Sequence, residues 1–154
     1  MKKLLIIAHA PSPNLQALQS AIVDGAQAPE IDNVEVKCSS PFDLTASEVL
    51  EADALILLTP ENLGYMSGAL KDFFDRCFYD LDGETDALPY ALAIRAGSDG
   101  TGTRRAVESI AQGLKWKAVQ APVIFRGQWR EDFLADAREL GMALAAALDI
   151  GIYS

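Results

Sequence analysis

The chain has 154 residues, of which half are hydrophobic, and residues 1–154 are expected to form a single domain that buries its own core. Thirteen lysines and arginines stand against 22 aspartates and glutamates, which gives a formal net charge of −9. This balance argues against a nucleic acid or an anionic membrane as a partner, because both are bound through clustered basic residues. An acidic surface suits a basic protein partner better.

The start of the chain resembles an export signal only superficially. Two lysines precede the apolar run Leu4–Ala8, but His9 and Pro11 end that run before the roughly 7–15 apolar residues that a signal needs. No later run approaches the roughly 20 residues needed to span a bilayer, so we expect a cytoplasmic protein. Cys38 and Cys77 match neither a metal-ligand spacing nor a disulfide framework, and we expect free, packed thiols and no metal site.

In the first third of the chain, strand and helix patterns alternate. Leu4–Ala8 is a continuous apolar run, typical of a strand that is buried on both faces, and apolar residues at helical spacing follow over residues 15–22. Val34–Cys38 alternates apolar with charged residues, which predicts an edge strand. Thr45 and Glu48 then form the capping-box pattern of a short helix.

The rest of the chain continues this alternation. Apolar runs predict three more buried strands, at Ala54–Leu58, Tyr90–Ile94 and Val123–Phe125. Apolar stripes at helical spacing predict helices over residues 66–77, 107–114 and 133–148. With the edge strand second in the chain and right-handed crossovers throughout, the simplest strand order is 2-1-3-4-5. The sequence therefore predicts an α/β three-layer sandwich around a five-stranded parallel sheet.

In such a sheet, a ligand binds at the carboxyl ends of the strands, where neighbouring connections diverge to opposite faces. Three predicted loops meet there: His9–Asn14, Thr59–Ser67 and Ala96–Gly102. In the first loop, Ser12 is a candidate N-cap and Pro13 suits the first helical position. Unpaired amides there favour a phosphate, and Ser12 and Asn14 can add hydrogen bonds. An ordinary helix cap, with His9 in a structural role, explains the same residues.

The second loop carries the most informative pattern, Thr59-Pro60-Glu61-x-x-Gly64-x-x-x-Gly68-Ala69-Leu70-Lys71-x-x-x-Asp75. It closely resembles the signature of NADPH-dependent FMN reductases and related flavodoxin-fold quinone reductases, and the order of elements extends the resemblance over nearly the whole chain. The resemblance implies a flavodoxin-like fold, FMN as cofactor, NAD(P)H as co-substrate and a homodimer. Family members often carry Tyr at Asn62 and Asn at Leu63, and a Ser or Thr at Leu15.

The resemblance also implies the residues that hold the flavin. The second loop would wrap the isoalloxazine ring, and the glycine-rich third loop would approach its pyrimidine edge. The cofactor-binding candidates are His9, Ser12, Asn14, Leu15, Thr59, Pro60, Glu61, Asn62, Leu63, Gly64, Tyr65, Gly97, Ser98 and Asp99. Arg104 and Arg105 either receive a nicotinamide-dinucleotide phosphate or form a solvated helix face, and Trp129 either borders the site or packs at its rim.

Three functions stay open at this point. The first is an FMN-dependent oxidoreductase that transfers hydride from NAD(P)H through flavin to a quinone, a flavin or a similar small-molecule acceptor, and it needs no catalytic side chain because the flavin carries the chemistry. The second is a flavodoxin-type electron carrier, although Tyr65 is the only aromatic residue in the second and third loops. The third is an interaction module without flavin. A phosphorelay receiver is excluded, because neither an acidic pair nor an acceptor aspartate follows the relevant strands.

Overall fold

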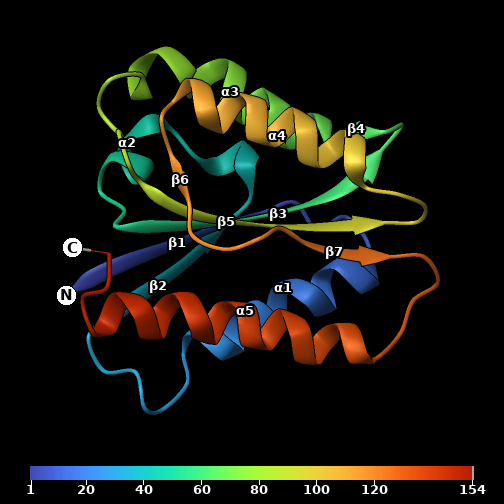
Figure 1. Cartoon of the computed structure of the whole chain (residues 1–154), viewed down its shortest axis with the longest axis horizontal. Helices are drawn as coiled ribbons and strands as arrows, with labels where there is room; N and C mark the ends of the chain where they lie inside the picture. Colours follow the sequence, from blue (N-terminus) through green and yellow to red (C-terminus); the bar gives the residue numbers. More distant parts are fainter. Residues whose placement is uncertain (154) are drawn as a thin grey trace.

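A central sheet separates two layers of helices in the computed structural model, which describes residues 1–153 (Figure 1). The main strands are β1 (Lys2–Ala8), β2 (Val34–Ser39), β3 (Ala54–Asn62), β5 (Pro89–Ala96), β6 (Lys117–Ala118) and β7 (Val123–Arg126). They lie in the order β2-β1-β3-β5, with β6 and β7 both beside β5, and all these pairs are parallel. The predicted class and strand order are confirmed, with β6 and β7 in the place of the fifth strand.

The helices cover both faces of the sheet (Figure 1). One layer contains α1 (Pro13–Ala26) and α5 (Asp132–Asp149), and the other contains α2 (Ala46–Leu50), α3 (Gly68–Leu81) and α4 (Thr101–Gly113). A 3-10 turn, η1 (Pro41–Asp43), joins β2 to α2. Alternate residues of β1 and β3 enter two separate cores, which explains why these strands are apolar without interruption. Among residues 1–153, no helix is both long and apolar enough to cross a bilayer.

The layer formed by α1 and α5 depends on two glycines. A Cβ on Gly25 would collide with the main-chain carbonyl of Arg138, and a Cβ on Gly141 would collide with that of Ile22. The two helices therefore pack backbone against backbone, and this contact fixes the position of α1 on its face of the sheet. The N-terminus of α1 is held in turn at the carboxyl end of β1.

The structure corrects the prediction of five simple strands. Strand β3 does not end at Leu58 but runs to Asn62, where β4 (Tyr65–Met66) pairs with it in antiparallel orientation, so the predicted second loop is largely a hairpin. The fifth strand is divided into β6 and β7, and Pro122 lies between them. Because proline has no N–H to donate to β5, it interrupts the ladder at this edge of the sheet.

The predicted helix starts are confirmed. The Ser12 hydroxyl accepts the N–H of Leu15 at 3.3 Å, and Pro13 occupies the first turn of α1. At the start of α2, the Glu48 carboxylate accepts hydrogen bonds from the amide and the hydroxyl of Thr45, at 3.0 and 2.8 Å. These caps satisfy amides that a helix leaves unpaired at its first turn.

The side chains of Trp116 and the two cysteines pack in or against the core. Trp116 is buried, and its indole N–H donates to the hydroxyl of Thr85 at 2.8 Å. Cys77 is buried and Cys38 is half-buried, and both are free thiols whose pKa values are raised by burial. Neither cysteine has the lowered pKa of a reactive thiolate.

Candidate functional site

Three connections meet at the carboxyl ends of β1, β3 and β5, and together they form the carboxyl-edge site: the first loop (residues 9–14), the hairpin (residues 59–67) and the third loop (residues 96–102). The His9 amide donates to the carbonyl of Leu58 at 3.0 Å, which ties the first loop to β3. The Thr103 hydroxyl donates to the Glu61 carboxylate at 3.2 Å, which ties the hairpin to α4. The structure thus brings the predicted segments together, as the sheet order requires.

The first loop presents backbone donors at the N-terminus of α1. Among the described residues, the amides of Ala10, Ser12 and Asn14 find no hydrogen-bond acceptor, while Pro11 and Pro13 have no N–H. The side-chain amide of Asn14 is exposed and makes no hydrogen bond within the described chain. Unpaired amides and the dipole of a 14-residue helix make this end of α1 suitable for an anion.

Two other predicted residues of the first loop have different environments. Leu15 is only 4% exposed, so its side chain belongs to the core and its amide is already held by Ser12. His9 is half-buried, and this desolvation lowers the pKa of its imidazole, which is therefore neutral at pH 7. Its ring lies edge-on to that of Phe42, with 6.1 Å between the centroids. His9 reaches the site as a neutral ring, whereas the side chain and the amide of Leu15 are both already engaged.

The hairpin turns tightly at Leu63 and Gly64, whose φ angles are +53° and +74°. Positive φ at both central residues is typical of a two-residue hairpin turn, and Gly64 adopts it without strain, whereas Leu63 does not. The side chain of Leu63 is fully exposed, that of Tyr65 is 40% exposed, and Asn62 is also exposed. The tip of the hairpin therefore presents both backbone and side chains at the edge of the site.

The base of the hairpin is buried and rigid. Thr59 is fully buried, and its hydroxyl accepts the N–H of Ser67 at 3.0 Å and donates to the carbonyl of Pro60 at 2.8 Å. Pro60 is buried as well. Thr59 and Pro60 thus form the buried base of the hairpin, while residues 61–65 provide its accessible surface.

The third loop is open to solvent and is anchored from the neighbouring strand. Gly97, Ser98 and Asp99 are exposed, and a Cβ on Gly97 would meet no atom within 4 Å. Arg126 at the end of β7 donates to the Asp99 carbonyl, and its guanidinium lies 3.9 Å from the Asp99 carboxylate. Gly100, with φ of +79°, then begins α4. Sequence reasoning missed the Arg126 anchor, because it depends on β7 lying beside β5.

The remaining candidates lie at the margin of the site. Arg104 forms an ion pair with Glu108 on the next turn of α4 at 3.1 Å, and Arg105 is exposed on the same helix. These positions suit the interpretation of a solvated helix face. The ring of Trp129 packs edge-on against Phe133, 5.6 Å between centroids, so it packs at the rim.

Lys71 and Asp75 form an ion pair on the surface of α3. Elsewhere in residues 1–153, His, Cys, Asp and Glu side chains do not gather in groups of three that could hold a metal ion. The carboxyl-edge site therefore offers backbone amides, small residues, one neutral imidazole and the carboxylates of Glu61 and Asp99, which already contact Thr103 and Arg126. Such a donor set suits a phosphate and a flat ring.

Comparison with known proteins identifies the family. Residues 18–133 match the model of the NADPH-dependent FMN reductase family. The chain belongs to this family. The matched range contains the hairpin and the third loop, and it begins after the first loop.

Individual relatives are flavodoxins. A flavodoxin from Aquifex aeolicus is 31% identical over 110 residues, which cover 71% of this chain but only 58% of that protein, so the chain spans less than two thirds of this relative. The structure of a flavodoxin from the domain Archaea matches with a TM-score of 0.80 at 18% identity, over 95% of this chain and 98% of the other. Two-electron reduced Megasphaera elsdenii flavodoxin matches with a TM-score of 0.74 at 17% identity, over 94% and 99%. These structures show that the family member described here has the flavodoxin-like fold.

Proposed function

We propose that this chain is an FMN-dependent oxidoreductase that transfers hydride from NADPH or NADH, by way of FMN, to a small-molecule acceptor such as a quinone or a free flavin. The observation that carries the proposal is the coincidence, at one edge of the sheet, of unpaired amides at the start of α1 with a rigid hairpin and an open, glycine-containing third loop. The family match supports the same cofactor. When bound, FMN supplies the acceptance and donation of hydride.

The phosphate of FMN suits the first loop. The amides of Ala10, Ser12 and Asn14, with the Asn14 side chain, can donate to its oxygens, and the positive end of the α1 dipole favours the negative charge. No residue from 9 to 14 is Lys or Arg, so all of this binding would come from hydrogen bonds and the dipole. The two prolines remove two donors, and we therefore expect moderate rather than very tight FMN binding.

The flavin ring suits the hairpin and the third loop. The hydrogen bond between Thr103 and Glu61 and the contact of Gly102 with the Gly64 carbonyl fix the hairpin before any ligand arrives. A fixed wall loses little conformational entropy when a ring packs on it. Gly97 has no side chain and no neighbour in the direction of a Cβ, so a ring edge can approach the backbone of the third loop there.

The test is a visible spectrum of the purified protein with added FMN, followed by anaerobic titration with NADPH and with NADH. The proposal predicts a perturbed flavin spectrum, bleaching of the 450 nm region by at least one nucleotide, and nucleotide oxidation when a quinone is added. A protein that binds FMN but is reduced by neither nucleotide would contradict the proposed activity.

A flavodoxin-type electron carrier is the second candidate, because the curated relative and the matched structures are flavodoxins and the chain has a net charge of −9. It predicts FMN that dithionite reduces and nicotinamide nucleotides do not, and binding to a basic redox partner protein. No flavin uptake from excess FMN would favour an interaction module instead. We also propose a homodimer, as the family resemblance implies, and sedimentation equilibrium tests this oligomeric state.

A further inference from the structure

Phe42 is a large apolar side chain at the carboxyl edge that the proposed function does not use. It lies in η1, directly after β2, and the pairing of Ile7 with Ser39 places this turn beside the end of β1 and the first loop. Phe42 is 60% exposed, and its ring meets the His9 ring edge-on. An exposed phenylalanine contributes little to folding, because its apolar surface stays in water.

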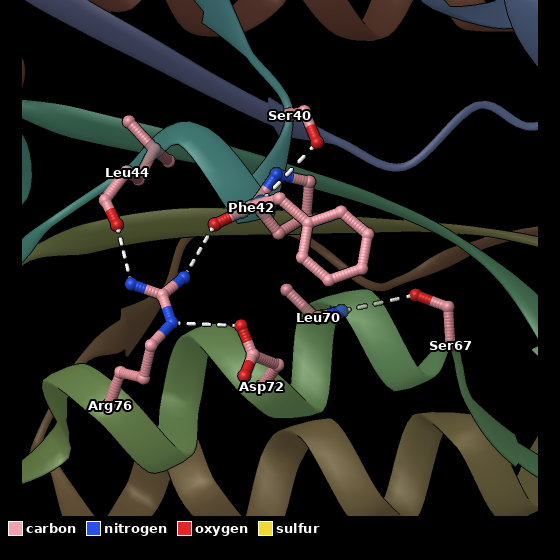
Figure 2. Close-up of polar contacts among 8 residues, drawn as sticks. Ser40, Phe42, Leu44, Ser67, Leu70, Asp72 and Arg76 are labelled. Carbon is pink, nitrogen blue, oxygen red and sulfur yellow. Dashed lines mark hydrogen bonds and ion pairs between the residues drawn. The ribbon is translucent and has the colours of Figure 1, made fainter.

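The backbone around Phe42 is nevertheless held from outside the turn. Arg76 of α3 donates to the carbonyl of Leu44 at 2.8 Å and to that of Pro41 at 2.9 Å, and its Nε donates to Asp72 at 2.8 Å (Figure 2). The hydrogen bond from Arg76 to Asp72 also raises the pKa of the guanidinium, so the clamp stays charged. One side chain thus bridges both ends of the turn to α3.

A hydrogen bond inside the turn and two buried residues also hold it in place. The hydroxyl of Ser40 accepts the N–H of Phe42 at 3.3 Å, and both Pro41 and Leu44 are buried. Figure 2 shows the Phe42 ring extending from this turn, away from the Arg76 guanidinium. The result is an exposed aromatic ring on a fixed support, which is the arrangement that stacks a flat ligand at low entropic cost.

The position of the hairpin indicates where such a ligand would lie. The hairpin contacts α4 through Glu61 and Gly64, and β1 lies on the other side of β3 from β5, with β2 and the turn that carries Phe42 next in the sheet order. The third loop contains no aromatic residue that could cover a ring. We propose that Phe42 is an aromatic wall of the carboxyl-edge site and stacks on a planar ring, either that of FMN or that of a nicotinamide or quinone substrate. This inference rests on the proposed function.

The experiment compares wild type, Phe42→Ala, Phe42→Tyr and the matched control Tyr79→Ala. Tyr79 is 87% exposed on α3 and has no part in the site, so it reports what the loss of an exposed aromatic does elsewhere. Two quantities are measured: the Kd for FMN, from quenching of flavin fluorescence, and the KM for NADPH and for menadione at saturating FMN. Thermal unfolding should be the same for all four proteins, because Phe42 is exposed.

If the ring of FMN stacks on Phe42, Phe42→Ala should weaken FMN binding by roughly tenfold, while Phe42→Tyr and Tyr79→Ala stay near wild type. If a substrate ring stacks there, the FMN Kd stays constant and the KM for menadione or NADPH rises by a similar factor. Both results support the wall. Unchanged Kd and KM in Phe42→Ala, or an altered oligomeric state as its sole effect, would overturn it. A wild-type protein that binds no FMN would contradict the proposed function itself and the wall with it.

Discussion

The packing of the hairpin on α4 can be tested by the substitution Gly102→Ala. A Cβ at this position would collide with the main-chain carbonyl oxygen of Gly64. Because the Cβ is fixed to the main chain of α4 and the carbonyl is part of the main chain of the hairpin, neither can rotate away, and the hairpin must move away from α4. Forcing an extra methyl group into a close contact costs about 1–3 kcal/mol. The movement also breaks the hydrogen bond between Thr103 and Glu61, which contributes about 0.5–1.5 kcal/mol.

The free energy of unfolding should therefore fall by about 1.5–4.5 kcal/mol, or roughly 3–18 °C in the unfolding midpoint of a chain of this size. The matched control is Gly68→Ala in the first turn of α3, where a Cβ meets no atom within 4 Å. This control reports the gain from helix propensity alone. Urea unfolding measures both variants, and FMN titration of Gly102→Ala should show weaker binding. Equal stability of the two variants would refute the packing of the hairpin against α4.

Three further substitutions test other parts of the structure. Gly25→Ala should lower the free energy of unfolding by about 1–3 kcal/mol, because its Cβ collides with the carbonyl of Arg138; unchanged stability in urea would rule out the close packing of α1 on α5. Leu63→Asn should raise the free energy of unfolding by about 1 kcal/mol, because Asn tolerates the left-handed conformation and the removal of the exposed Leu63 side chain loses no packing. A less stable variant would argue against strain at the turn. The single histidine, His9, should titrate in NMR with a pKa below the ordinary value of about 6.5. Because the folded state disfavours the charged imidazole, the contribution of His9 to the free energy of unfolding is fully present above the ordinary pKa and is lost as the pH falls. His9→Gln should flatten this pH dependence of stability. A pKa of His9 at or above the ordinary value would refute its burial.

The sequence predicted those parts of the fold whose signals are local and long. The runs in β1, β3 and β5 are apolar on both faces, and the capping residues of α1 and α2 follow known patterns, so strand order and helix starts followed from the chain alone. Strands β4 and β6 have two residues each, too few to show a period. A turn with Leu rather than Asn before Gly also lacks the usual hairpin signature.

The parts of the site that depend on tertiary contacts were not predictable. The Arg76 clamp joins residues 32 and 35 positions apart in sequence, and the Arg126 anchor joins residues 27 apart. No local pattern marks such pairs, and the fixed position of Phe42 follows only from the contact of η1 with α3. The backbone donors of the first loop, in contrast, were predictable, since proline and serine at the start of a helix define which amides are free.

The most direct test of the site is hydrogen–deuterium exchange of the backbone amides with and without FMN. We expect slower exchange in the first loop, the tip of the hairpin and the third loop, with no change at the opposite edge of the sheet, around β6. Slower exchange in all three segments would place the flavin at the carboxyl edge. Protection confined to other segments, or no protection at saturating FMN, would contradict the binding of FMN at the carboxyl-edge site.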